Sequence, residues 1–155
     1  MNLFRLLLLL FAVPGALLAQ TPATTKSKPS PLEWNTSDHS PRSRALELAG
    51  GFSGDGYKVR DGFWSGSLEK GTPVLIEVNL FAGNDYWFSA ANLDPSTRLK
   101  VSIFDVHGNP VGSQAFDEAS RAAAGISVWQ SGRYFIRVAM TEGDKADTCM
   151  VYSYK

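Results

Sequence analysis

The chain has 155 residues, of which 44% are hydrophobic, and this length suits one ordinary domain. With 15 basic and 15 acidic side chains the formal net charge is zero, so the sequence lacks the clustered positive charge that nucleic acid or anionic lipid requires. A single cysteine excludes an internal disulfide and a thiolate zinc cluster.

Residues 1–19 have the pattern of a signal peptide, with a basic start, an apolar run and the small residue Ala19 at the expected cleavage position. The apolar run is too short to cross about 30 Å of hydrocarbon as a helix, so we expect no membrane span after cleavage. An uncleaved anchor is the alternative, because Leu17 occupies a position where a small residue is preferred. The expected location is periplasmic or secreted.

Residues 20–41 are rich in Thr, Ser, Lys and Pro. Such a segment buries too little apolar area to offset the entropy of ordering its backbone, so we predict a disordered tether. Leu32 and Trp34 are its apolar exceptions, and they either dock on the domain or form a short recognition element. Residues 42–155 are then the single folded domain.

A short helix is predicted at the start of this domain. Ser40 is placed to cap it and Pro41 suits the first helical position. Gly50 and Gly51 are expected to end it by allowing a left-handed residue. Four glycines then predict irregular backbone up to residue 62.

The rest of the chain has the alternation of strands. Residues 74–80 and 86–91 alternate with a period of two around a turn at 81–84, which predicts a hairpin. Further strands are predicted at residues 64–68, 99–103, 111–116, 126–129, 133–139 and 149–154, with a turn at 107–110 and a helix at 117–124. About eight short strands at even spacing predict an all-β fold, an antiparallel jelly-roll-like sandwich with a short N-terminal helix.

Three segments carry a family resemblance. They are Gly83-Asn84-Asp85-Tyr86-Trp87-Phe88, Leu99-Lys100-Val101-Ser102-Ile103-Phe104-Asp105 and Ser131-Gly132-Arg133-Tyr134-Phe135-Ile136-Arg137-Val138. In this order the segments resemble the bacterial pre-peptidase C-terminal domain over about residues 64–155. The resemblance implies a small jelly-roll-like sandwich in a secreted protein, often appended to a peptidase. The chain departs from that family at Arg98, where the family's loop is often rich in aspartate.

No catalytic residue is predicted. Nucleophilic catalysis needs a base held near a serine, cysteine or threonine, whereas His39 lies in the predicted tether and His107 in a predicted turn. Paired carboxylates, as at Asp117 and Glu118, fall in predicted loops, where acidic residues favour solvent. We therefore expect a protein that is not an enzyme, with a small secreted hydrolase as the weaker alternative.

We expect no cofactor, with calcium as the open alternative. Calcium takes six to eight oxygen ligands, and Asp85, Asp94 and Asp105 lie near glycine or proline turns that expose carbonyls. A calcium-stabilised structural envelope protein would use them. The competing interpretation is that they are solvated turn residues.

Aromatic residues give the candidate binding surface. Trp87 and Phe135 lie on strand faces opposite the predicted core, and with Trp34 they are candidates for stacking on sugar rings or anchoring a protein partner. Cover by the N-terminal helix or the tether is the alternative. Trp64 and Trp129 have the same two interpretations, and the core is the expected place of both.

Cys149 is expected to be a buried small hydrophobe in the last strand, with pairing between chains as the alternative. Together these observations predict an exported, non-enzymatic binding or accessory module for protein or polysaccharide outside the cytoplasm.

Overall fold

A computed structural model describes residues 39–155. The predicted signal peptide (1–19), nearly all of the predicted tether and Trp34 lie outside the described residues. No helix within residues 39–155 is long and apolar enough to cross a membrane.

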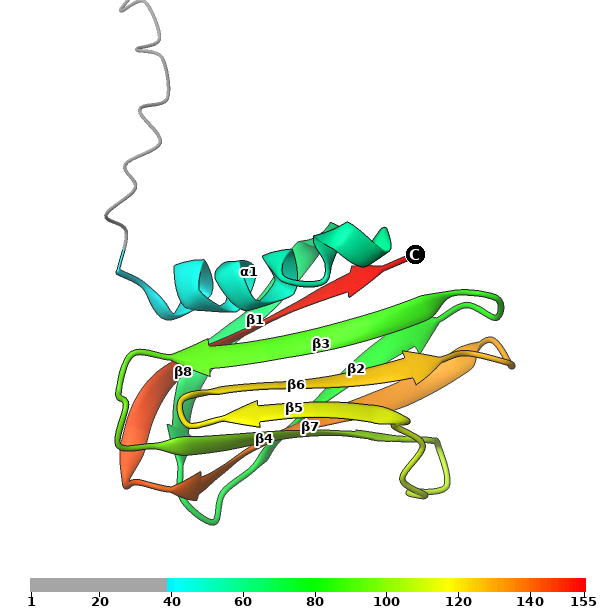
Figure 1. Cartoon of the computed structure of the whole chain (residues 1–155). Helices are drawn as coiled ribbons and strands as arrows, with labels where there is room; N and C mark the ends of the chain where they lie inside the picture. Colours follow the sequence, from blue (N-terminus) through cyan, green and yellow to red (C-terminus); the bar gives the residue numbers. More distant parts are fainter. Residues whose placement is uncertain (1–38) are drawn as a thin grey trace, which may run out of the picture. The chain divides into compact units, whose positions relative to one another are not determined.

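Two antiparallel sheets form a sandwich, and one helix covers the outer face of the larger sheet (Figure 1). The five-stranded sheet has the order β1-β8-β3-β6-β5 and the three-stranded sheet has the order β2-β7-β4. The elements are α1 (Pro41–Gly50), β1 (Lys58–Glu69), β2 (Val74–Leu80), β3 (Asp85–Asn92), β4 (Arg98–Phe104), β5 (Gln114–Glu118), β6 (Arg121–Ser127), β7 (Gly132–Glu142) and β8 (Lys145–Tyr154). The predicted sandwich of eight strands with a leading helix is confirmed.

The start of α1 and its end at Gly50 are as predicted, but the conformation of the residue that ends it is not. The Ser40 Oγ accepts a hydrogen bond from the Ser43 backbone N–H at 3.1 Å, and Ser43 Oγ in turn accepts one from the Ser40 N–H. Gly51 stays right-handed with φ −59°, and the chain continues into a short 3-10 turn. The left-handed residue is Gly56, with φ +89°, so the expected left-handed conformation at Gly50 or Gly51 is wrong, although the helix ends there.

The predicted irregular segment is also wrong at its end, because β1 begins at Lys58. Lys58 and Val59 pair with the end of β8, and the register then shifts before Phe63. The partner strand supplies hydrogen bonds that the local glycine-rich sequence does not reveal.

The predicted hairpin between residues 74–80 and 86–91 does not form. A turn does follow residue 80, with Gly83 at φ +86°, but β2 pairs with β7 whereas β3 pairs with β6 and β8. Of the seven connections between strands, only β5–β6 stays within one sheet. β3 is buried on both faces from Tyr86 to Asn92, as suits a central strand covered on both sides.

The predicted helix at residues 117–124 is a tight β-hairpin. β5 ends at Glu118, Ala119 takes φ +46°, and β6 follows. The alanines of β6 pack on both sides of the sheet: Ala122 and Ala124 face the sandwich core, and Ala123 packs with Leu48 of α1. Burial on two faces selects small side chains and overrides the helix propensity of alanine.

The main core lies between the sheets, and smaller clusters lie beneath α1. The largest fully buried side chains of the main core are Tyr86, Phe88, Leu68, Leu80, Ile103, Ile136, Met150 and Val138. Ala45 and Ala49 of α1 pack against Ala91, Cys149 and Val151. The helix is therefore a third layer, and it leaves the outer face of the three-stranded sheet without such cover.

Candidate functional site

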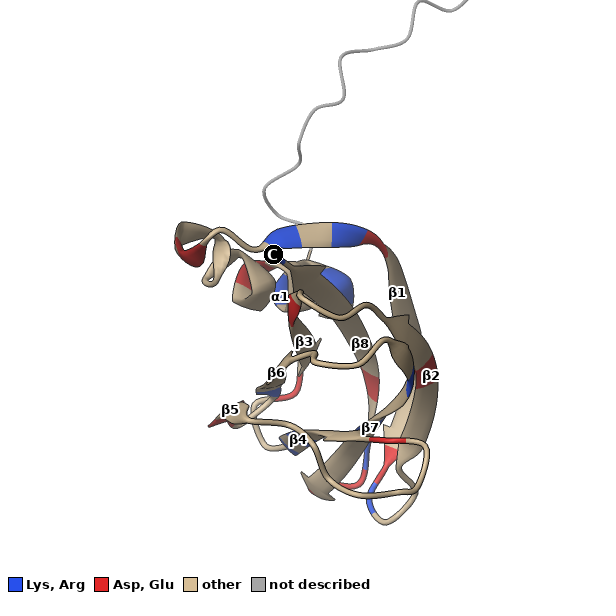
Figure 2. Cartoon of the chain, turned by 90° about the vertical axis from the view of Figure 1, so that its right-hand side faces the viewer, with Lys and Arg blue, Asp and Glu red and all other residues tan. Residues whose placement is uncertain are grey.

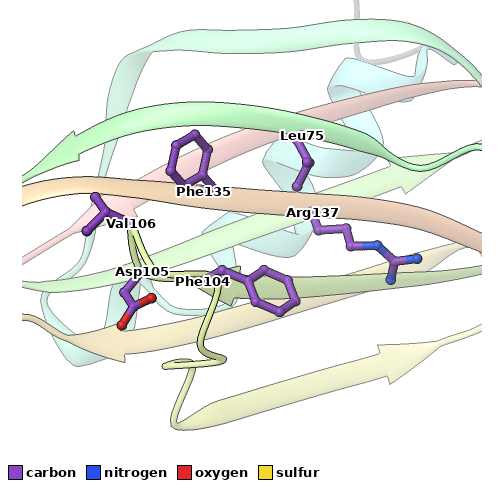
Figure 3. Close-up of a pocket in the computed structure, with 7 residues that line it drawn as sticks. Leu75, Phe104, Asp105, Val106, Phe135 and Arg137 are labelled. Atoms are coloured by element: carbon purple, nitrogen blue, oxygen red, sulfur yellow. The ribbon is translucent and has the colours of Figure 1, made fainter.

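A groove of about 400 Å³ lies on the outer face of the three-stranded sheet (Figure 3). Phe135 of β7 lies between two neighbouring strands, paired with Phe104 of β4 on one side. Arg137, the next residue of β7 on this face, pairs with Leu75 of β2, and the Leu75 side chain is 62% exposed. Val106, in the loop after β4, lines the same groove. These side chains face solvent because the alternate residues of β7 fill the core.

The groove combines apolar surface with one basic side chain, Arg137, and one acidic side chain, Asp105. Arg133, farther along the same face, lies 3.9 Å from Glu77 of β2. Within residues 39–155 no carboxylate forms an ion pair with Arg137 or with Lys100 of β4. Aromatic side chains and arginine are the types enriched at protein interfaces.

Asp105 shapes one end of the groove by organising the loop after β4. Its Oδ1 accepts hydrogen bonds from the backbone N–H groups of His107 and Asn109, both at 2.8 Å, and its Oδ2 accepts one from the Asn109 side chain at 3.0 Å. These bonds, chiefly those from Asn109, hold the pKa of the Asp105 carboxyl below its ordinary value. The carboxylate is thus occupied in closing a turn.

Of the predicted binding aromatics, Phe135 lies half-buried in the groove. Trp87 is only 8% exposed, and its ring stacks on Phe52 with centroids 4.2 Å apart. An exposed binding role for Trp87 is therefore wrong, because α1 and the turn that follows it cover the indole; the covering alternative is the one that forms. Trp34 lies outside the described residues.

The other two tryptophans differ from one another. Trp64 is partly buried against the main core. Trp129 is 91% exposed, so its predicted place in the core is wrong. The reason is that Val128, at 2% exposure, takes the inward position at the end of β6 and turns its neighbour outward.

The three aspartates proposed for calcium serve separate turns. Asp94 accepts hydrogen bonds from the Ser96 hydroxyl at 2.6 Å and the Ser96 N–H at 2.9 Å, which lower its pKa. Asp85 lies 4.0 Å from the Lys155 ammonium, and Asp105 closes the loop described above. Among the described residues, no three His, Cys, Asp or Glu side chains are placed to share a metal ion.

Cys149 is fully buried beneath α1, as predicted, and burial raises the pKa of its thiol. The positive charge of Arg42 lowers that pKa to a smaller extent. The raised pKa keeps the sulfur in the protonated, less reactive form.

Basic residues also gather at the start of β1 and on the neighbouring helix (Figure 2). The Arg42 guanidinium lies 4.6 Å from the centre of the Phe63 ring, and that of Arg60 lies 5.6 Å from the Tyr154 ring. These cations are thus engaged by aromatic faces of the same domain.

Two groove residues, Phe104 and Leu75, were not predicted as binding residues from the sequence. Both stand at the outward positions of their strands, so a large apolar residue at an outward position was the available signal. The position of Val106 in the groove could not be predicted from the sequence, because it depends on how the loop after β4 folds against the sheet.

Comparison with known proteins adds an independent indication of function. No curated protein matches the chain. Residues 88–151 match the model of the secretion system C-terminal sorting domain, and the match covers less than half of the chain. It runs from within β3 to within β8, so it includes six of the eight strands in whole or in part. This stretch is therefore similar to domains that direct secretion of the protein that carries them.

Proposed function

We propose that the described domain is a non-enzymatic module that directs an exported protein to a secretion system. The observation that carries this proposal is the match to sorting domains over residues 88–151, all of which lie in one folded sandwich. The predicted signal peptide supports it, since such a peptide would bring the chain across the inner membrane first.

The resemblance to pre-peptidase C-terminal domains supports an accessory role of the same kind. That resemblance covers about residues 64–155 and so contains the matched stretch. The resemblance implies a module that is often appended to a peptidase, and a sorting domain likewise serves the secretion of the protein that carries it. A non-enzymatic role also fits the position of His107, whose backbone N–H serves the Asp105 turn on an exposed loop.

Sorting requires a protein that recognises the domain, and we propose that the groove around Phe135 is the surface recognised. It lies within the match on its β4 and β7 sides, and it offers aromatic and aliphatic side chains with Arg137 at one end. Because Arg137 has no carboxylate partner within residues 39–155, the partner segment is expected to pair an apolar side chain with an acidic one.

The experiment follows the full chain, tagged with an epitope, in a bacterium that has this secretion system and in the same strain without its outer-membrane translocon. The fractions of protein in the periplasm, on the surface and in the medium are measured by immunoblot. Secretion is expected only in the intact strain. Equal release from both strains contradicts the proposed function.

A double variant, Phe135→Ala with Arg137→Ala, tests the surface. Its secreted fraction is expected to fall about tenfold, the loss that one buried interface contact typically causes. The matched control is Phe63→Ala, since Phe63 is a half-exposed aromatic on β1 outside the match. Normal secretion of the double variant refutes the groove as the recognised surface while leaving the sorting function intact.

A further inference from the structure

Trp129 is an exposed aromatic that neither the fold nor the sorting function explains. It lies in the connection between β6 and β7, and 91% of its surface is accessible. Leaving an indole in water forfeits the stabilisation that burying it provides. A position of this kind on an ordered loop suggests a ligand.

The loop that carries Trp129 is fixed on both sides. The Val128 N–H donates to the Asn84 carbonyl at 3.0 Å, and the Val128 carbonyl accepts from the Gly83 N–H at 2.8 Å. On the other side, the Ser131 hydroxyl oxygen accepts a hydrogen bond from the Ala82 N–H at 2.8 Å. The backbone beside the indole is thus ordered before any ligand arrives, which lowers the entropy cost of binding.

Hollows with hydrogen-bonding groups flank the indole. One, of about 610 Å³, is lined by Trp129 with Gln130, Ser113, Ser127 and Asp105 among its polar residues. A smaller hollow of about 200 Å³ is lined by Trp129 with Asn84, Asp85 and Ser127. The site therefore offers an aromatic face, amide and hydroxyl groups, and the carboxylate of Asp85.

We propose that Trp129 is the platform of a binding site for a neutral polysaccharide, one sugar ring of which stacks on the indole. A sugar ring has an apolar C–H face that suits an aromatic ring, and hydroxyl groups around its edge that suit amides and carboxylates. The amides of Asn84 and Gln130 and the carboxylate of Asp85 are placed to bind those hydroxyl groups.

The charges of the site select the neutral class. The charged side chains that line the two hollows are Asp85 and Asp105, and both are acidic. An anionic polysaccharide would be repelled by them. The larger hollow is also lined by Val111, Ile126 and Tyr134, whose apolar surface would contact the C–H face of a sugar ring beside the indole. The site would bind the secreted protein to a glycan, and this binding would be a function separate from sorting.

The test uses the full chain after export and affinity electrophoresis in gels containing mixed-linkage β-glucan, xyloglucan, galactomannan or, as the charged comparison, alginate. Wild type is expected to be retarded by at least one neutral polymer and not by alginate. Trp129→Ala is expected to weaken that binding about tenfold or more. Trp129→Phe should keep part of it, and Phe63→Ala should keep all of it.

Circular dichroism and the melting temperature of Trp129→Ala should match wild type, since the indole is almost wholly exposed. No retardation of wild type by any neutral polymer overturns the proposal, as does equal retardation of wild type and Trp129→Ala. Retardation by alginate as strong as that by the neutral polymers overturns the assigned sugar class. Trp129-dependent self-association in sedimentation, without polysaccharide binding, assigns the indole to an interface between copies of the chain and also overturns it.

Discussion

Replacing Trp87 by alanine should destabilise the whole domain, because this residue joins α1 to the five-stranded sheet. One face of the indole stacks on Phe52 at a centroid distance of 4.2 Å and an interplanar angle of 7°. The opposite side lies against β6 at Gly125, where an added Cβ would stand 3.0 Å from the indole. Leu48 of α1 packs against the same ring.

The size of the effect follows from the burial. Trp87 is 8% exposed, and burying an aromatic side chain removes about 200 Å² from water, which at about 25 cal/mol per Å² corresponds to about 5 kcal/mol. This value is an upper bound, since the unfolded chain already buries part of that area. We expect Trp87→Ala to lower the free energy of unfolding by about 4 kcal/mol, as is typical of buried tryptophan.

The assay is urea unfolding of the full chain, followed by far-UV circular dichroism because the variant lacks one fluorophore. Phe52→Ala should cost about 2 kcal/mol, and the double variant should cost about 1 kcal/mol less than the sum of the single variants, since both remove the same stacked pair. A loss below about 1 kcal/mol for Trp87→Ala would refute the burial of the indole between α1 and the sheet, and strict additivity would refute its stacking on Phe52.

Two further predictions concern the loops. Gly143→Ala should lower the free energy of unfolding in urea by about 3 kcal/mol, because Gly143 has φ +94° and the new Cβ would stand 2.8 Å from the buried Thr97 side chain. The control is Gly71→Ala, which should cost only about 1 kcal/mol because Gly71 has φ +83° but open space around it. Equal costs for the two variants would exclude the clash with Thr97. The loop after β4 should loosen in acid. The hydrogen bonds from Asn109 lower the pKa of Asp105 in the folded state below its ordinary value of 3.8. The stabilisation from these bonds is therefore fully present above pH 3.8 and is lost as the pH falls through the lowered pKa. Amide exchange of Asn109 should accelerate in that range beyond the intrinsic pH dependence, and an unchanged protection factor would count against this account.

The faces of individual strands were predictable from the sequence because they depend on local alternation. In β4, Leu99, Val101 and Ile103 point inward as their period of two requires. In β7, Ile136 is likewise buried and Phe135 faces outward, which identified one groove residue before the structure. Alternation reports which residues share a face, and this information lies within a few residues of chain.

Pairing between strands was not predictable in the same way, because it depends on distant partners. The pattern of β2 and β3 fits a hairpin as well as it fits two strands in opposite sheets. The alanines of β6 resemble a helix until their burial on both faces is known. The exposure of Trp129 was not predicted for a related reason. A short apolar run does not show which of its residues faces solvent where the strand ends.

The topology also bears on how much of the chain the proposed sorting function would need. β1 and β2 lie outside residues 88–151, yet β1 pairs along β8 and β2 pairs along β7. Val74, Ile76 and Val78 of β2 pack against the main core. Without these two strands, β7 and β8 would become edges with unpaired backbone groups, and part of the core would meet water. The unit that would have to be intact for the proposed recognition of the folded groove is therefore the whole sandwich, which extends beyond the matched residues on the N-terminal side.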